Sequence, residues 1–554
     1  MSFDSMQSSE VAIKSFGTPT SSGWLERFSL LEKAPFAFFF GAILGTSTPG
    51  FDHSMIAWFG LAPLLVLVRS ARTHLEATFI GLTFGLGYYL VALSWYLGLF
   101  PLRWLGLDDW VAVQAVGCVW TLESLHESIL FAIFAWLVYA LPMRSGFVPH
   151  IHRPFFPYMI SVPVIWVFVH WVIATSVVFL GMPVNQLAYT QHGYVNLLQV
   201  AKYFGSGGVD FMLLLSNCAV AALIFEFTPL ATRLQPRIDQ ISPKLGAGVD
   251  VIFASFVVAL ATTWGADHVR SIARMTQAEN PANFMQQTPA VPVAVLQGNI
   301  SIEGERLKTV SPTEVANIYS QLGSNKGEAI LILPEAAVGV HQFGPGLLLS
   351  RLKGICDAEK KEAITGSVEQ SEGSVINALR MIASPQPKKS LYVMQRLVPF
   401  GDAPPFGPFS HISSQMTASV TGEGGESVVT ATSAKLLDSV FGKVGASIST
   451  ELVFPALIAD EVRRGASLLV NVTNLNRFHN ASLNKQVIAA ATLRAVENER
   501  YVVVATNTGI SAVIDPSGII TSRSHPGMRG LILDKVQFLY KETPFSRMTR
   551  MWWI

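Results

Sequence analysis

The apolar residues of this chain are concentrated in one half of it. Residues 34–265 carry nearly all of the long apolar runs, whereas residues 285–545 have the composition of an ordinary globular protein. Across all 554 residues, 50% are hydrophobic and only 14% are charged, against about a quarter in typical soluble domains. A helix of about 20 apolar residues can cross a bilayer. The sequence therefore predicts a membrane-embedded half followed by a water-soluble half.

Seven segments of the first half are apolar enough to be membrane helices, although the first is short. They are residues 34–47, 55–70, 75–99, 112–141, 157–178, 209–227 and 248–265. The fourth contains Glu123, His126 and Glu127. Ionisable side chains within a span usually face the bundle interior or a wet cavity. The sequence leaves open whether these three groups only pack between helices or serve a function.

The basic residues of the short loops indicate an orientation. Loops rich in Lys and Arg lie on the cytoplasmic side of a membrane. Basic residues precede the first segment and follow the second, fourth and sixth, at Lys14, Arg27, Lys33, Arg69, Arg72, Arg144, Arg153, Arg233, Arg237 and Lys244. The alternate connections contain few. We therefore expect a cytoplasmic amino terminus, and seven crossings then place everything after residue 265 outside the cytoplasm.

These observations predict five regions along the chain. They are a cytoplasmic segment at 1–33, a transmembrane bundle at 34–265, a linker at 266–290, an extracytoplasmic domain at 291–540 and a tail at 541–554. The polar start lacks the basic-then-apolar order of a cleaved signal peptide, so the first apolar segment is expected to stay as an anchor. The connection 179–208 is apolar and aromatic but broken by Gly and Pro. It fits an interfacial lid or platform and a plain surface loop equally well.

Charge and cysteine content exclude several functions. The net charge of +1 gives no indication of a nucleic-acid partner. The three cysteines, Cys118, Cys218 and Cys356, have no spacing typical of a metal site or a disulfide framework. We expect them to be small buried hydrophobic residues, because free Cys is among the most buried residue types.

From residue 291 onward, short β-branched runs alternate with helical stretches, which predicts a layered α/β domain. Reactive groups in such domains tend to lie at the carboxyl ends of strands. Two strands end in polar residues of this kind. One runs into Pro334-Glu335, and the other, VGASI, runs into Ser449-Thr450-Glu451.

The order of motifs in this half resembles a known family. The motifs are QGN at 297–299, LPEAA at 333–337, LVPFGD at 397–402, TELVFP at 450–455, NVTN at 471–474 and ATNTGISAVIDPSG at 505–518. Together with the preceding bundle, they resemble the apolipoprotein N-acyltransferases. The resemblance implies a nitrilase-like four-layer α-β-β-α sandwich on an all-α transmembrane bundle of about seven helices, in the bacterial inner membrane with the sandwich on the periplasmic side. It also implies transfer of an acyl chain from a membrane phospholipid to the α-amine of a diacylglyceryl-cysteine lipoprotein, without a cofactor or metal.

The resemblance also assigns candidate site residues. The family uses a Glu as general base, a Lys that stabilises the tetrahedral intermediate and a Cys nucleophile. The base matches Glu335, whereas the Lys position is Met394 and the Cys position is Ser449. Two supporting acids match Asp402, a shortened Glu, and Glu451.

The two changed positions put turnover in doubt. A thiol with a pKa near 8.5 is partly ionised at neutral pH, whereas a serine hydroxyl needs a strong base. Removing one oxyanion-type interaction costs about 100- to 1000-fold in rate. Another charged side chain could replace the missing Lys or act as the base. The candidates, each of which could equally be an ordinary solvated surface group, are Lys388, Lys389, Arg396, Lys443 and His479.

Three functions therefore compete. The first is an N-acyltransferase, and the second is a catalytically impaired or inactive relative that binds lipid or lipoprotein in the same pocket. A soluble-type nitrilase acting on small amides is disfavoured, because such enzymes lack a membrane bundle and also need the Cys and the Lys. The family usually ends in an eighth span, whereas this sequence stops at TPFSRMTRMWWI, an interfacial aromatic cluster at most.

Overall fold

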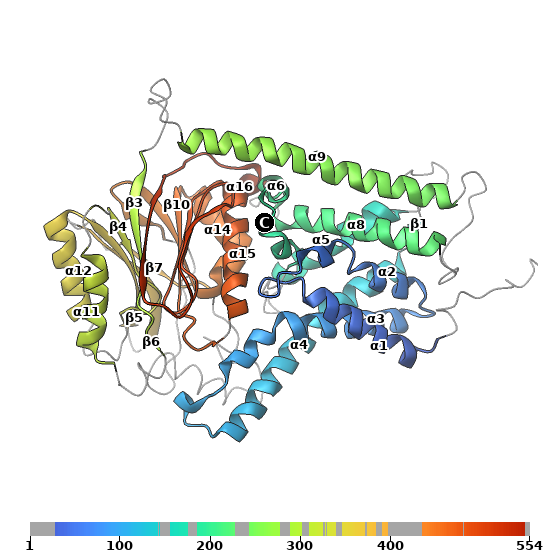
Figure 1. The fold of residues 1–554 in the computed structure, drawn as a ribbon, viewed down its shortest axis with the longest axis horizontal. Coiled ribbons are helices and arrows are strands. Elements are labelled where there is room, and N and C mark those ends of the chain that lie inside the picture. Colours follow the sequence, from blue (N-terminus) through green and yellow to red (C-terminus); the bar gives the residue numbers. More distant parts are fainter. Residues whose placement is uncertain are drawn as a thin grey trace, which may run out of the picture.

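The computed structural model describes most of the two predicted halves. The described residues are 28–141, 143–144, 156–175, 186–227, 243–277, 289–301, 310–324, 327, 329–338, 346–371, 374–383, 390–396, 431, 435–479 and 481–548. Figure 1 shows a helical bundle beside an α/β domain, and the two meet in the middle of the molecule. The division into a helical half and an α/β half is therefore confirmed. Asp402, Lys388, Lys389 and the last six residues lie outside the described residues.

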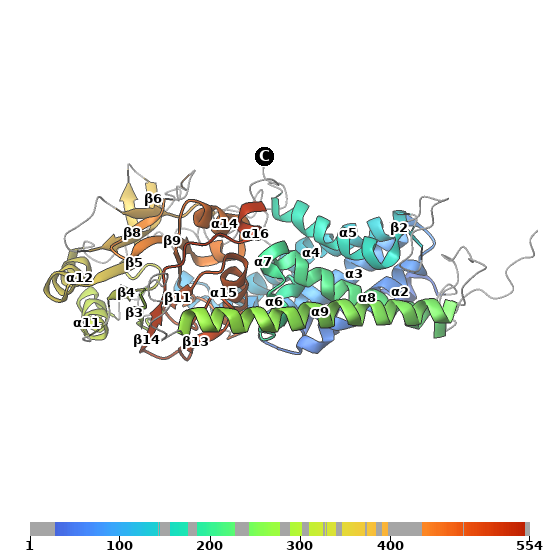
Figure 2. The same cartoon turned by 90° about the horizontal axis from the view of Figure 1, so that it is seen from above.

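Each of the seven predicted apolar segments lies on helical structure. The main helices are α1 (Leu30–Gly45), α2 (Ala62–Arg69), α3 (His74–Ala92), α4 (Asp109–Ala140), α5 (Tyr158–Thr175), α8 (Ser206–Phe227) and α9 (Pro243–Gln277). Four of the described helices are long and apolar enough to cross a membrane, within α3, α4, α8 and α9. Figure 2 shows that α9 runs along the bundle and reaches the α/β domain. Its last twelve residues continue into the segment predicted to be a linker.

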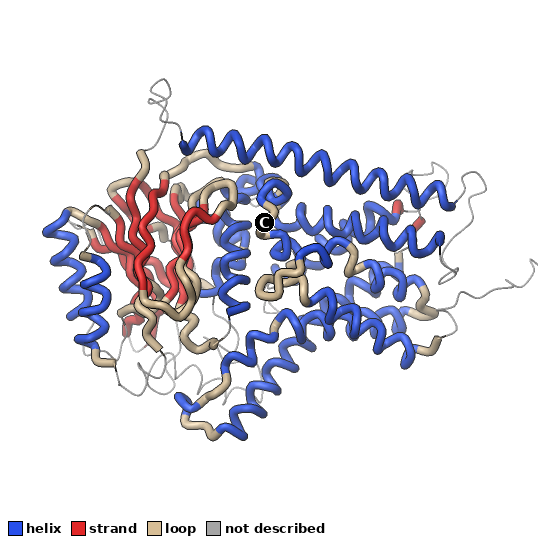
Figure 3. The backbone as a smooth tube through the Cα atoms, in the orientation of Figure 1, coloured by secondary structure: helices blue, strands red, loops and turns tan. Residues whose placement is uncertain are grey.

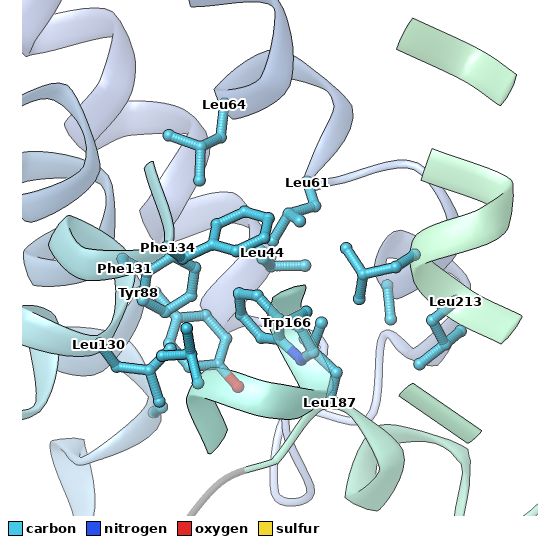
Figure 4. Close-up of a cluster of buried hydrophobic side chains, with 14 of the residues drawn as sticks. Leu44, Leu61, Leu64, Tyr88, Leu130, Phe131, Phe134, Trp166, Leu187 and Leu213 are labelled. Carbon is cyan, nitrogen blue, oxygen red and sulfur yellow. The ribbon is translucent and has the colours of Figure 1, made fainter. Parts of the chain in front are cut away.

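The bundle is packed through aromatic side chains and close helix contacts. The ring of Trp166 lies 5.2 Å from Phe131 and 4.9 Å from Phe134, in the apolar cluster drawn in Figure 4. A Cβ added at Gly81 would lie 2.4 Å from the carbonyl oxygen of Phe131, so α3 and α4 approach closely only because Gly81 has no side chain. Small residues at helix interfaces allow this close packing in membranes.

Several helix ends meet at one end of the bundle. The ammonium group of Lys33 on α1 donates to the carboxylate of Glu76 on α3 at 2.7 Å and to the carbonyl oxygen of Ser70 at 2.9 Å. The guanidinium of Arg69 lies over the rings of Phe225 and Tyr158, 4.0 Å and 5.1 Å from their centroids. These contacts gather the basic ends of α1 and α2 with the ends of α3, α5 and α8. We call this the basic end of the bundle.

The other end of the bundle contacts the α/β domain and is called the outer end here. The described part of the connection 179–208 lies there and contains η5 (Leu187–Gln191), α6 (Val195–Leu198) and α7 (Ala201–Phe204). Part of its apolar surface is buried against α15 (Ala481–Asn498) in one cluster, through Ala188, Tyr189, Leu197, Leu198 and Ala201. The aromatic residues Tyr194, Tyr203 and Phe204 are exposed. The ammonium group of Lys202 and the ring of His268 both contact the carboxylate of Glu499. This connection therefore fills the junction between the two halves.

The α/β domain contains two mixed sheets (Figure 3). The first has the order β14-β3-β4-β5-β6-β7 and the second the order β13-β12-β11-β10-β9-β8. Strands of the first are β3 (Val291–Gln297), β4 (Ile330–Ile332), β5 (Glu362–Ser371), β6 (Ser374–Ile382), β7 (Leu391–Val393) and β14 (Gly530–Val536). Strands of the second are β8 (Leu437–Ser439), β9 (Gly442–Ile448), β10 (Leu468–Thr473), β11 (Val502–Thr506), β12 (Ala512–Ile514) and β13 (Ile520–Arg523). In each sheet the three central strands are parallel to one another, β3-β4-β5 in the first and β9-β10-β11 in the second.

Helices lie on the outer faces of the two sheets (Figure 1). Helices α11 (Pro312–Gly323) and α12 (Gly346–Glu359) cover the first sheet, and Cys356 is buried in that layer. Helices α14 (Pro455–Arg463) and α15 lie on the side of the second sheet that faces the bundle, and the short α16 (Pro544–Met548) packs on α14. The apolar inner faces of the two sheets share one core. This packing brings the carboxyl ends of strands from both sheets to one region.

Candidate active site

Glu335 follows β4 and accepts hydrogen bonds from two described residues. One carboxylate oxygen accepts from the side-chain amide of Asn377 at 2.7 Å, and the other accepts from the backbone N–H of Asn474 at 2.8 Å. The backbone here passes very close to β5, since a Cβ added at Gly366 would lie 2.6 Å from Cα of Glu335. Asn377 belongs to the first sheet and Asn474 follows β10 of the second. The Glu335 carboxylate therefore bridges the two sheets.

Met394 follows β7 and is fully buried. Its backbone N–H donates to the carbonyl oxygen of Asn377 at 2.9 Å, and its sulfur lies 4.0 Å from the same amide nitrogen that donates to Glu335. The residue predicted to stand at the family lysine position thus lies close to the candidate base. A thioether is a weak acceptor and carries no charge, so Met394 cannot provide the electrostatic stabilisation that an ammonium group would.

Ser449 occupies the sharp turn at the end of β9. Its φ of 54° lies in the left-handed region, which costs an L-residue about 1–2 kcal/mol. The side-chain amide of Asn471 donates to the carbonyl oxygen of Ser449 at 3.2 Å and so helps to hold this turn. Strained turns after a strand are also found where hydrolases expose a nucleophile. The Ser449 side chain is partly buried in this turn.

The hydroxyl of Ser449 has no base beside it in the described part of the chain. No described side chain lies within hydrogen-bond distance of it. The guanidinium of Arg396 lies over the ring of Phe454, and a ring nitrogen of His479 lies 3.2 Å from the carbonyl oxygen of Gly98. Lys443 is exposed. None of these three candidate substitutes forms a hydrogen bond with Ser449.

Glu451 ties the Ser449 turn to the strand that leads to Met394. Its side chain is fully buried and accepts from the backbone N–H groups of Ile448, Gln395 and Arg396 at 2.8, 2.6 and 3.0 Å. It also accepts from the hydroxyl of Tyr392 at 2.8 Å. Burial raises the pKa of Glu451 to about 7, although these hydrogen bonds favour the ionised form. The role of Glu451 in this structure is therefore to position two neighbouring segments.

Two chains of contacts connect Glu335 with the Ser449 turn. The first passes from Glu335 through Asn377 to Met394, whose neighbour Gln395 binds Glu451. The second passes through the 471–474 segment, which binds Glu335 at one end and Ser449 at the other. The structure thus places Glu335, Met394, Ser449 and Glu451 around one region. Asp402 lies outside the described residues.

Sequence reasoning missed several contributors to this region. Asn474 is the last residue of the NVTN motif, and its position directly after a strand could have marked it as a candidate site residue. Asn377 lies within β6 and faces Glu335 only because of the register between β5 and β6, which pairs Val368 with Asn377. No local pattern marks such a residue. Tyr392 likewise belongs to the site only through its contact with Glu451.

We predict that Glu451→Gln lowers the unfolding free energy of the α/β domain by about 2 kcal/mol. The amide would turn N–H groups toward backbone donors that now bind a carboxylate, and unsatisfied buried groups cost about 1–3 kcal/mol each. Chemical denaturation of the detergent-solubilised chain, followed by circular dichroism, measures the change. An unchanged midpoint and slope would contradict the positioning role.

The same variant should alter the pH dependence of stability. Because the pKa of Glu451 is raised from 4.5 to about 7 in the folded chain, the native state keeps a proton that the unfolded state has lost within that window. Stability therefore falls as pH rises from about 4.5 to 7. The wild-type chain should lose more stability than Glu451→Gln between pH 5 and 7, and equal losses would show that this carboxyl does not titrate as described.

Family models match both halves of the chain. Residues 40–219 match the model of the apolipoprotein N-acyltransferase N-terminal domain, and residues 293–543 match the model of the carbon-nitrogen hydrolases. The apolipoprotein N-acyltransferase of Geobacter metallireducens is 28% identical over 488 residues, which cover 87% of this chain and 84% of the relative. The apolipoprotein N-acyltransferase of Gloeobacter violaceus is 27% identical over 517 residues, which cover 91% of this chain and 88% of the relative.

The chain is a homologue of the apolipoprotein N-acyltransferases. The relative from Nostoc shows the same extent of similarity, with 24% identity over 86% of this chain. In this N-acyltransferase homologue, both the membrane half and the α/β half are matched, and the predicted family resemblance is confirmed. The α/β half is a nitrilase-like domain with two mixed sheets.

Proposed function

We propose that this chain transfers an acyl chain from a membrane phospholipid to the α-amine of a diacylglyceryl-cysteine lipoprotein. The observation that carries the proposal is the placement of Glu335 and Ser449 at strand ends of two different sheets. They are linked through the 471–474 segment, which binds both, and through the contacts that lead from Asn377 to Glu451. Glu335 occupies the position of the family base, and its carboxylate is oriented by two donors. This arrangement suits the removal of a proton from an attacking group.

In the proposed reaction, the oxygen of Ser449 attacks the ester carbonyl of the phospholipid while Glu335 takes its proton. The bond between that carbonyl carbon and the glycerol oxygen breaks, and lysophospholipid leaves with the proton. The lipoprotein amine then attacks the new serine ester, forms the amide and returns the hydrogen to Ser449. Met394 occupies the lysine position and Ser449 the cysteine position, so turnover is slow compared with an enzyme that has the usual pair.

A second function is favoured by one specific feature of the same region. The Ser449 hydroxyl has no basic partner among the described residues, and Met394 is buried and uncharged beside Glu335. A site of this kind could bind lipid or lipoprotein without transferring an acyl group. Binding without transfer is therefore the alternative that an assay has to separate from catalysis.

The orientation of the proposed enzyme rests on the two ends of the bundle. The basic residues Lys33 and Arg69 lie at the end opposite to the α/β domain, and the basic connections mark the cytoplasmic side. We infer seven crossings and an α/β domain on the periplasmic face of the bacterial inner membrane. In a background without native cysteines, Met528→Cys on the exposed surface should react with a membrane-impermeant maleimide in intact spheroplasts. Labelling only after lysis would place the domain in the cytosol.

The assay uses the purified full chain in detergent with acyl-labelled phospholipid and a diacylglyceryl peptide. We expect labelled amide on the peptide with the wild-type chain and a loss of at least about 100-fold with Ser449→Ala, since the covalent route requires the hydroxyl. Transfer that survives Ser449→Ala but depends on Glu335 would favour direct attack by the amine. Phospholipid binding with no transfer would establish the alternative function.

A further inference from the structure

Helix α4 carries three ionisable side chains on one face, outside the site described above. Glu123, His126 and Glu127 have the spacing i, i+3 and i+4, which places them side by side on a helix. One ligand atom from each lies within 4.8 Å of the other two. A ring nitrogen of His126 is 3.9 Å from a carboxylate oxygen of Glu123. We call these three residues the α4 cluster.

Glu127 is the most buried residue of the α4 cluster. It is only 9% exposed, and its side chain forms no hydrogen bond or ion pair with any residue in the described part of the chain. The neighbouring carboxylate of Glu123 is 14% exposed, and among the described residues no Lys or Arg forms an ion pair with either group. Two adjacent carboxylates in an apolar bundle need a compensating positive charge or protons, because burying an unpaired charge is costly.

The α4 cluster lies near the outer end of the bundle. The indole N–H of Trp120, one turn earlier on α4, donates to the carbonyl oxygen of Leu90 near the end of α3 at 3.1 Å. Ser128, which directly follows Glu127, packs on Gly85 of α3. A Cβ added at Gly85 would lie 3.0 Å from the Cα atom of Ser128. The cluster is thus roughly one to two helical turns, about 5–10 Å, inside the end of α3.

The cluster is also connected to the junction with the α/β domain. Tyr96, in the 3-10 segment after α3, is close enough to interact electrostatically with both carboxylates. Its ring stacks on Trp95 with centroids 4.1 Å apart, and Trp95 contacts Phe478 at 5.2 Å. Phe478 lies in the loop that begins with Asn474, a partner of Glu335. An ion held by the cluster would therefore stabilise the segment that packs on this loop.

We propose that Glu123, His126 and Glu127 bind one divalent transition-metal ion such as Zn²⁺, Mn²⁺ or Co²⁺. One imidazole nitrogen and two carboxylates form a donor set that suits these ions, whereas Mg²⁺ and Ca²⁺ prefer oxygen ligands alone. Ligand atoms at bond lengths of about 2.1 Å are roughly 3.4 Å apart in a tetrahedral site. The ligand atoms now lie within 4.8 Å of one another, so they have to move closer together to hold an ion. Three protein ligands leave at least one position for water or for Tyr96.

The test measures metal binding by the full chain, purified without a histidine tag and stripped with a chelator. We expect one Co²⁺ per chain, detected by its visible absorption, and displacement by Zn²⁺. The isosteric variants Glu127→Gln and His126→Asn should weaken binding at least about 10-fold. The exposed control Glu314→Gln should leave it unchanged. No binding at micromolar Co²⁺, or binding that ignores both variants, would overturn the proposal.

A second measurement needs no variant and so does not depend on their folding. Zn²⁺ should raise the thermal unfolding temperature of the wild-type chain, because an ion that binds only the folded state stabilises it. The same concentration of Mg²⁺ should have no effect. The absence of any shift with Zn²⁺, Mn²⁺ and Co²⁺ would overturn the proposal, independently of whether the α/β domain transfers acyl groups.

Discussion

Replacing two side chains together, Ser449→Cys and Met394→Lys, should raise the rate of acyl transfer at least about 100-fold. The thiol, with a pKa near 8.5, supplies some thiolate at neutral pH. The ammonium group would enter the space of the buried Met394 side chain, beside Asn377 and the Glu335 carboxylate. One oxyanion-type interaction is worth about 100- to 1000-fold in rate. The initial rate with labelled phospholipid and diacylglyceryl peptide measures the gain.

The control for this experiment keeps the new thiol and moves the new charge. Ser449→Cys combined with Met528→Lys adds the same two residue types, but residue 528 is 60% exposed and lies in the connection between β13 and β14. This control should gain much less than the site pair. If both double variants have the wild-type rate, residues 394 and 449 do not occupy the lysine and cysteine positions of the family.

Replacing the candidate base, Glu335→Gln, should lower acyl transfer by about 100- to 10,000-fold, the range that general-base catalysis contributes. An amide retains the size of the side chain and one acceptor for Asn377 or Asn474, but it cannot take a proton. Binding of phospholipid, measured by fluorescence of a labelled lipid, should stay the same. The exposed Glu314→Gln serves as the matched control.

Two results would contradict this role. Transfer at the wild-type rate in Glu335→Gln would show that another group removes the proton. A parallel loss of lipid binding and transfer would show that Glu335 supports the shape of the pocket and has no separate part in the chemistry.

The division into a helical half and an α/β half could be predicted from the sequence, because it depends on where apolar residues are concentrated along the chain. The apolar segments lie on helices, and β9 includes the predicted strand VGASI. The end of α9 was harder to place. This helix runs to Gln277, beyond the apolar run, because its polar last turns reach the α/β domain, and composition alone cannot distinguish such an extension from a linker.

The candidate site was only partly predictable, for a related reason. Glu335 and Ser449 stand at strand ends within recognisable motifs. Asn377 contributes through the pairing of β5 with β6, and Glu451 acts through donors 55 and 56 residues away in the chain. Such contacts depend on how the two sheets pack against each other, and a short sequence motif does not predict that packing. Whether a base lies beside Ser449 likewise depends on this packing, and among the described residues no side chain forms a hydrogen bond with its hydroxyl.

The most direct test of the proposed chemistry looks for the acyl group on the protein itself. The wild-type chain is incubated with phospholipid and no acceptor, digested and analysed by mass spectrometry. The proposal predicts one acyl group on the peptide that contains Ser449, lost on addition of diacylglyceryl peptide and missing from Ser449→Ala and Glu335→Gln. An unmodified Ser449 peptide from a preparation that still acylates the acceptor would contradict it.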